Sequence, residues 1–169
     1  MKAVVLLSAL LSLPVLAAEP TLYGRYEYLQ LAELGKTLKA KMDTGAYTAS
    51  LSARDIQRFK REGEEWVRFR LAADGADDSL YEHRLARISK IKNRADEGAD
   101  EPAAADVSKR PVIDLQLCLG HELRTVEVNL ADRSSFNYPL LIGAKALREF
   151  NAAIDPAKRF TAGKPACRG

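Results

Sequence analysis

Apolar and polar positions alternate along much of this chain, which is the pattern of β-strands with one buried face. The alternation is clean over residues 66–71 and again over residues 111–119. After a Gly120-His121 turn it returns over residues 124–130, so the two segments are predicted to form a hairpin. The positions expected to face the core are Val67, Phe69, Leu71, Val126, Val128 and Leu130.

The remaining segments extend this pattern. Residues 22–29 and 37–42 are predicted as strands on either side of a turn at Gly35. Residues 53–60 and 144–150 each have apolar side chains three apart, which predicts two short helices. Several short strands joined by turns are typical of a small barrel-like domain. We therefore expect an all-β fold with one or two short helices.

The first residues have the pattern of a secretory signal. Lys2 precedes an apolar stretch over residues 3–13, and Pro14 and small alanines follow it. The stretch is short for a membrane span, although an uncleaved N-terminal anchor is the alternative. We expect a cleavable signal peptide over residues 1–18, one domain over residues 19–169, and a periplasmic or secreted protein.

The charges exclude one class of partner and single out one segment. The formal net charge of +3 is close to balance and the basic residues are scattered, so no nucleic-acid partner is expected. Residues 93–108 contain five acids and almost no large apolar side chains. Such a segment cannot bury enough apolar surface to order itself, so a mobile acidic loop is predicted there.

The two cysteines are Cys118 and Cys167. By strict alternation Cys118 shares the polar face of its strand with Asp114 and Gln116, where it is available to pair. In an oxidising compartment we expect a disulfide with Cys167, and the alternative is two free thiols. The spacing fits no metal site.

The strongest candidate for chemistry is Asp43-Thr44-Gly45-Ala46, which directly follows a short alternating strand. Asp-Thr-Gly on a turn after a strand is the nucleus of aspartic proteases, which need two carboxylates that share one proton. The chain has only one such tripeptide, so the second aspartate would come from another copy. The alternative is a plain turn in which Asp43 accepts backbone hydrogen bonds and Gly45 has a positive φ.

A second signal lies about a hundred residues later, where an apolar strand ends at Ile142 and Gly143 and leads into the predicted helix. Together with the Asp43 block, it makes the chain similar to a bacterial family of retropepsin-like aspartic endopeptidases, often labelled "ATP-dependent zinc protease". The resemblance covers nearly all of the mature chain. The blocks that carry it are residues 39–51, 109–113, 128–133, 138–143 and 154–156.

The resemblance implies a closed retropepsin-like barrel and assigns roles to residues. Asp43 would be the catalytic carboxylate, one from each protomer of a homodimer, and Thr44 would orient the loop through its hydroxyl. Gly45 and Ala46 would bring backbone N–H groups close to the carboxylates, and Ile142 and Gly143 would back the loop. The flap of retropepsins would fall within residues 80–112, although no short Gly-rich hairpin is present there.

The family label mentions zinc and ATP, but this sequence contains neither a zinc-binding nor an ATP-binding motif. It contains no His-Glu-x-x-His and no Gly-x-x-x-x-Gly-Lys-Ser/Thr. Its two histidines, His83 and His121, lie in separate polar segments and are expected to be exposed. Many family members carry a histidine where this chain has Ser52. We therefore expect no metal and no cofactor.

Three functional hypotheses follow. The first is an exported, homodimeric aspartic endopeptidase that hydrolyses peptide bonds with water held between two Asp43 carboxylates. The second is a non-catalytic β-barrel module that binds a peptide or an envelope protein. The third is a structural or regulatory component of a larger envelope system. The intact Asp-Thr-Gly-Ala favours the first, since a binding module needs no ionisable group there.

Overall fold

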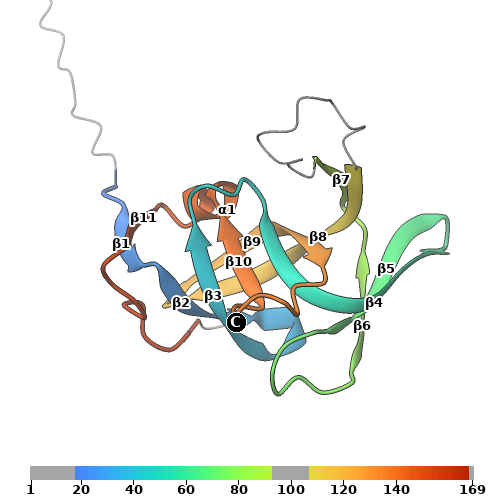
Figure 1. Ribbon diagram of the computed structural model, residues 1–169, viewed down its shortest axis with the longest axis horizontal. Helices are drawn as coiled ribbons and strands as arrows, with labels where there is room; N and C mark the ends of the chain where they lie inside the picture. The colour runs from blue at the N-terminus through green and yellow to red at the C-terminus, as the bar shows by residue number, and fades with distance from the viewer. Residues whose placement is uncertain (1–17, 93–106, 168–169) are drawn as a thin grey trace, which may run out of the picture.

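The computed structural model describes residues 18–92 and 107–167, and the fold is that of a β-barrel with additional strands at two of its sides (Figure 1). The predicted signal peptide, apart from Ala18, lies outside the described residues. So do residues 93–106 of the predicted acidic loop. The acidic loop was predicted over residues 93–108, but its last two residues, Val107 and Ser108, already begin a strand.

Six strands close the barrel, in the order β10–β3–β2–β8–β9–β4, with β4 pairing again to β10. Two of these pairings, β10–β3 and β4–β9, are parallel, and the others are antiparallel. This closed sheet confirms the predicted all-β barrel. The strands are β2 (Tyr26–Leu31), β3 (Lys36–Asp43), β4 (Ala49–Arg61), β8 (Val107–Leu119), β9 (Glu122–Ala131) and β10 (Leu140–Gly143).

The other elements extend or cover the barrel. Strands β5 (Glu64–Leu71) and β6 (Leu80–Arg84) continue the sheet beyond β4, and β7 (Arg87–Lys92) pairs with β8. A separate parallel pair joins β1 (Thr21–Gly24) to β11 (Ala152–Asp155). The helical elements are the 3-10 turn η1 (Ala32–Leu34) and the helix α1 (Ala144–Glu149), the second of which confirms the helix predicted at 144–150. Within the described ranges, no helix is long and apolar enough to span a membrane.

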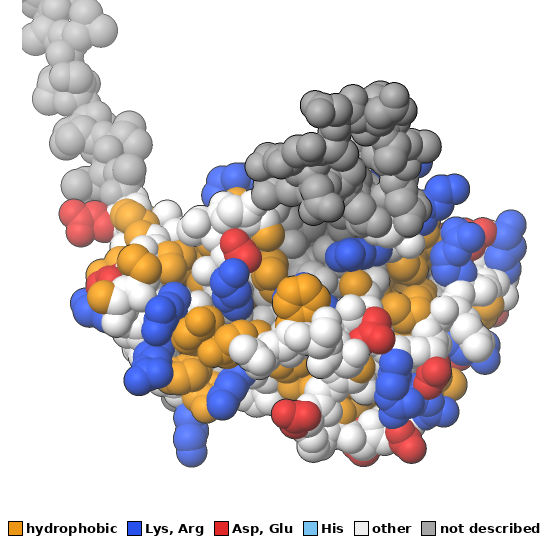
Figure 2. Space-filling view, viewed as in Figure 1, with side chains coloured by type: hydrophobic (Ala, Val, Ile, Leu, Met, Phe, Trp, Pro, Cys, Tyr) orange, Lys and Arg blue, Asp and Glu red, His pale blue; other side chains and the backbone are white. Residues whose placement is uncertain are grey.

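The barrel interior is filled by the inward face of each strand. All six side chains predicted to face the core from β5 and β9 are buried there. Full burial of a Leu or Phe side chain stabilises a fold by roughly 1.5–3 kcal/mol, so this face holds the strands in register. Outside, Lys and Arg side chains are spread over the visible face with acids among them, rather than gathered in one patch (Figure 2).

The helix predicted over residues 53–60 is wrong, because these residues belong to β4. The strand contains a β-bulge between Arg54 and Gln57, where Asp55 has a φ of 54°. A bulge inserts one extra residue and shifts the alternation by one position. Ile56 and Phe59 therefore stand three apart in an extended strand, a spacing that imitates one face of a helix.

Two other local features differ from the sequence reading. The strand predicted over residues 22–29 is interrupted at Arg25, so that β1 and β2 join different sheets. Cys118 lies outside the hydrophobic core cluster, but it is fully buried because the C-terminal segment covers it. There it forms a disulfide with Cys167, with the two Cα atoms 5.9 Å apart.

Candidate active site

Asp43 is the last residue of β3, at the point where the chain leaves the barrel sheet. Along β3 the buried side chains are those of Leu38, Ala40 and Met42, so Asp43 projects from the opposite face with Lys39 and Lys41. Its side chain is 23% exposed. The carboxylate is thus placed on the outer face of the barrel, where another molecule can reach it.

The Asp43 carboxylate is held by a cation and by its own loop. Lys41 Nζ lies 2.9 Å from Oδ2, and the Gly45 N–H donates to Oδ1 at 3.1 Å. Burial of the carboxyl raises the pKa of Asp43. The Lys41 ammonium and the N–H groups of Gly45 and Ala46 lower it by more than burial raises it, so the pKa of Asp43 lies below its ordinary value. The isolated protomer therefore keeps Asp43 ionised.

The rest of the tripeptide leaves room for a second molecule. Thr44 and Gly45 are exposed, and the Thr44 hydroxyl makes no hydrogen bond to any described residue. Ala46 closes the turn by donating its N–H to the Asp43 carbonyl at 3.3 Å. Gly45 does not have the positive φ that a plain turn was expected to require. The glycine is therefore not explained by backbone conformation alone.

Gly143 lies directly behind the loop, because β10 pairs with β3 in a register that sets Gly143 opposite Asp43. A Cβ on this glycine would lie 2.8 Å from backbone atoms of Tyr47 and Thr48, so no side chain fits. Just beyond it, the N–H groups of Ala144 and Lys145 donate to the carbonyls of Ala46 and Tyr47 at 2.7 and 3.0 Å. Gly143 thus permits the close crossing that braces the Asp43 loop, next to the fully buried Ile142.

Sequence reasoning missed a buried polar network beneath this loop. The Ser50 hydroxyl donates to Asn129 Oδ1 at 2.9 Å, and Asn129 Nδ2 donates to the Ala49 carbonyl at 2.9 Å. Ser52, also buried, accepts the N–H of Arg133 at 3.1 Å. These three residues stand at outward positions of their strands, between residues of the core, so the alternation gave no signal that they would be buried. Buried polar groups need partners, and here distant segments of the chain supply them.

Sequence reasoning also missed the cations beside the loop. A cavity of about 480 Å³ opens next to residues 46–48, and three cations line it: Lys90 on β7, Arg110 on β8 and Arg133 after β9. Tyr47, with 64% of its surface exposed, stands at the same cavity. Because these cations come from three separate segments, no local motif could have indicated them.

The histidines are not arranged to hold a metal. Over residues 18–92 and 107–167, no three His, Cys, Asp or Glu side chains are close enough to share an ion. His121 is exposed, whereas His83 is half-buried with its ring 6.1 Å from that of Phe69, so its predicted exposure is wrong. Burial lowers the pKa of His83, and the charge of Glu33 opposes this effect only in part.

Comparison with known proteins finds similarity over most of the chain. The family model described as RimB-like, retropepsin-like aspartic endopeptidase RimB, matches residues 22–165. A crystal structure of the Legionella pneumophila (strain Philadelphia 1) protein Lpg0085, described as of unknown function, superposes with a TM-score of 0.67 and 37% identity. The match covers 83% of this chain and 97% of the Legionella chain.

Curated relatives are longer proteins. A probable alpha-L-glutamate ligase from Shewanella halifaxensis is 32% identical over 142 residues, and one from Desulfotalea psychrophila is 29% identical over 145 residues. The matched segment covers 83% of this chain in both cases, but only 30% and 29% of the two relatives. The chain therefore spans less than a third of the length of these relatives.

Proposed function

Because the chain belongs to the RimB-like family of retropepsin-like aspartic endopeptidases, we propose that it is an exported endopeptidase with a dyad of Asp43 carboxylates from two identical protomers. The observation that carries this proposal is the placement of Asp43. Its side chain is ionised and projects from the outer face of the barrel. The loop that carries it packs closely against β10, because Gly143 has no side chain to keep the two segments apart. One such aspartate per chain leaves the dyad incomplete without a second copy.

In the proposed dyad, the two carboxyl groups share one proton. The ionised carboxylate removes a proton from a water molecule, and the water oxygen attacks the carbonyl carbon of the peptide. The protonated partner donates its proton to the carbonyl oxygen, which gives a tetrahedral diol. Transfer of a proton to the amide nitrogen then lets the C–N bond break. The Gly45 N–H group, 3.1 Å from Oδ1, keeps each carboxylate in place during these transfers.

Export to the periplasm or beyond the cell belongs to the same proposal. It is supported by the signal pattern of residues 1–18 and by the Cys118–Cys167 disulfide, because disulfides persist in oxidising compartments. The substrate is then a peptide or protein of that compartment.

A second candidate function is a non-catalytic module that binds a peptide or an envelope protein. It is favoured by one observation, namely that related segments make up about 30% of longer proteins named as probable alpha-L-glutamate ligases. In such a setting the barrel could present a substrate to another domain. Residue Asp43 would then serve only as a hydrogen-bond acceptor for its loop.

The test compares the native protein with Asp43→Asn on a peptide library, with product masses as the readout. Asn keeps the shape but removes both ionisable groups from a symmetric dimer, so we expect cleavage to be abolished. Asp114→Asn, at an exposed position of β8, is the matched control and should cleave normally. Activity should also fall on dilution as the dimer dissociates, which sedimentation can follow in parallel. Cleavage that survives Asp43→Asn, or that a chelator abolishes, would refute the dyad.

A further inference from the structure

The cavity of about 480 Å³ beside the Asp43 loop is lined by segments that lie far apart in the sequence. Residues 46–48 of the loop form one part of its lining, and Ser89 and Lys90 of β7 form another. Among the described strands, β7 pairs only with β8. A substrate that fills this cavity contacts both segments, so the position of β7 relative to the loop decides where the substrate lies with respect to Asp43.

A single carboxylate, that of Glu127 on β9, connects these two segments. Arg87, the first residue of β7, donates Nε and Nη2 to Glu127 Oε2 at 3.1 and 2.7 Å. Lys145 on α1 places its Nζ 3.0 Å from the same oxygen. The backbone N–H of Lys145 also donates to the Tyr47 carbonyl at 3.0 Å, so this residue braces the Asp43 loop as well. Glu127 thus joins the start of β7 to the helix that holds the loop.

The Glu127 carboxylate is partly shielded from water and firmly ionised. Its side chain is 21% exposed, less than that of either cation. The Arg87 guanidinium holds the pKa of Glu127 at about 2, with help from the Lys145 ammonium and against the effect of partial burial. The contacts therefore persist at neutral and mildly acidic pH. Three donors converge on one oxygen, which restricts the geometry more than an isolated surface ion pair does.

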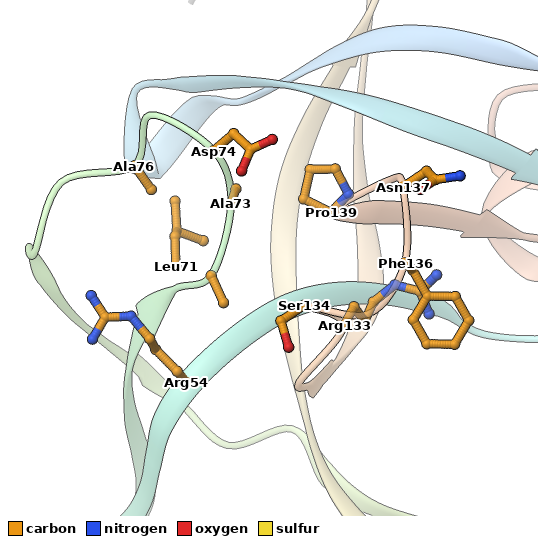
Figure 3. Close-up of a pocket in the computed structure, with 11 residues that line it drawn as sticks. Arg54, Leu71, Ala73, Asp74, Ala76, Arg133, Ser134, Phe136, Asn137 and Pro139 are labelled. Atoms are coloured by element: carbon orange, nitrogen blue, oxygen red, sulfur yellow. The ribbon is translucent and has the colours of Figure 1, made fainter.

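Other charged groups nearby do not make this connection. Asp114 lies directly opposite Glu127 in the β8–β9 pairing, but it is exposed and forms no ion pair with a described residue. Arg54, which lines the neighbouring pocket of about 560 Å³ shown in Figure 3, pairs with Asp78. That pair joins β4 to the β5–β6 loop and involves neither β7 nor α1. Glu127 is therefore distinguished by its partners and not by its charge alone.

We propose that Glu127 is a positioning residue, which fixes β7 relative to the Asp43 loop through Arg87 and Lys145. Glu127 does not itself line the cavity, so it acts through these two partners. A displacement of about 1 Å between the groups that hold a substrate and the groups that react can lower the rate by about a hundredfold. The effect on cleavage rests on the proposed function, whereas the connection between the two segments does not.

The connection is tested apart from cleavage, by amide hydrogen exchange followed by NMR. The reporters are the Ala86 N–H at the base of β7, which donates to a β8 carbonyl, and the N–H groups of Ala144 and Lys145 that brace the loop. Glu127→Ala should speed exchange at all three by about threefold or more. Exchange in β2, on the other side of the barrel sheet, should not change and serves to detect a global loss of stability.

A double-variant comparison shows whether the connection runs through Glu127. Arg87→Gln changes only the β7 end, yet we expect it to speed exchange at the two α1 amides as well. In a protein that already carries Glu127→Ala, Arg87→Gln should add nothing at these amides. Asp114→Asn and Asp78→Asn, which each remove a carboxylate that is not part of the connection, should leave them unchanged.

Kinetics test the consequence for the reaction. Glu127→Ala should lower kcat by about tenfold or more and leave KM within about twofold, because each segment keeps its own contacts to the substrate. The acid limb of the kcat/KM profile should stay in place, since position and not protonation is altered. Asp114→Asn should match the native protein in both constants. Arg87→Gln provides the same comparison if Glu127→Ala does not fold.

The outcomes separate the two proposals. Unchanged exchange at the α1 amides in Arg87→Gln, or an additive effect in the double variant, would overturn the connection. A raised KM with kcat unchanged, or an equal loss of kcat in Asp114→Asn, would overturn the positioning role. Coupled exchange in a native protein that cleaves no peptide would leave the connection standing and refute the endopeptidase.

Discussion

At the scale of single residues, the unusual feature of the candidate site is the pairing of Asp43 with Lys41 on the same strand. Lys41 is nearly half exposed, so the pair itself adds little to stability, and its effect is on protonation. Lys41→Met removes a cation that lowers the pKa of Asp43, so the pKa rises. In the proposed dyad, the acid limb of the kcat/KM profile reports the carboxyl that must be ionised, and we expect that limb to move to higher pH.

Lys39→Met is the matched control for this prediction. Lys39 lies on the same exposed face of β3, but it forms no ion pair with a described residue. The acid limb of the control should stay where it is in the native protein. An acid limb that is unchanged in Lys41→Met, measured with the same peptide, would show that Lys41 does not influence the carboxylate in the active dimer.

At the scale of elements, the site depends on how closely β10 passes behind the Asp43 loop. Gly143→Ala would force a Cβ against backbone atoms at 2.8 Å, so either the loop or the strand must move. Such overpacking lowers the free energy of unfolding by roughly 1–3 kcal/mol. Because the loop carries Asp43, we also expect a large loss of cleavage rate under conditions in which the variant is still folded. Gly45→Ala is the control for urea unfolding, since its Cβ would meet only Asp43 Oδ1, at 3.4 Å. A Gly143→Ala protein as stable as the native one would contradict the close crossing.

At the scale of the whole molecule, the C-terminal segment is fastened across the barrel at two places. The buried Glu27 carboxylate accepts hydrogen bonds from Gly24, Thr161 and Ala162, and the Cys118–Cys167 disulfide closes a loop with a sequence separation of 49. A link of this length restricts the unfolded chain. Reduction should therefore lower the free energy of unfolding by about 2–4 kcal/mol, as measured by urea unfolding with and without dithiothreitol.

The double variant Cys118→Ser/Cys167→Ser is the control for the reductant. It should unfold at lower urea than the native protein, and dithiothreitol should leave its transition unchanged. Two free thiols in the denatured, unreduced native protein would show that the link does not form.

The sequence by itself determined the features that depend on neighbouring residues. Alternation predicted the inward faces of β5 and β9, and the Gly120-His121 turn predicted the hairpin of β8 and β9. These two predictions are confirmed, because a period of two and the conformations open to a turn are local properties of the chain. Asp43-Thr44-Gly45 also singled out a loop after a strand, and its chemistry stays a prediction.

Tertiary structure decided what depends on contacts between distant segments. Residues 53–60 form part of β4 and not the expected helix, because pairing with β5 outweighs a weak local preference. Coverage by the C-terminal segment buried Cys118. The closed barrel brought Lys90, Arg110 and Arg133 from three separate strands or loops to one cavity beside the Asp43 loop. Spacing along the chain does not predict these long-range contacts, because the order in which strands pair is set by how the whole sheet closes around its core.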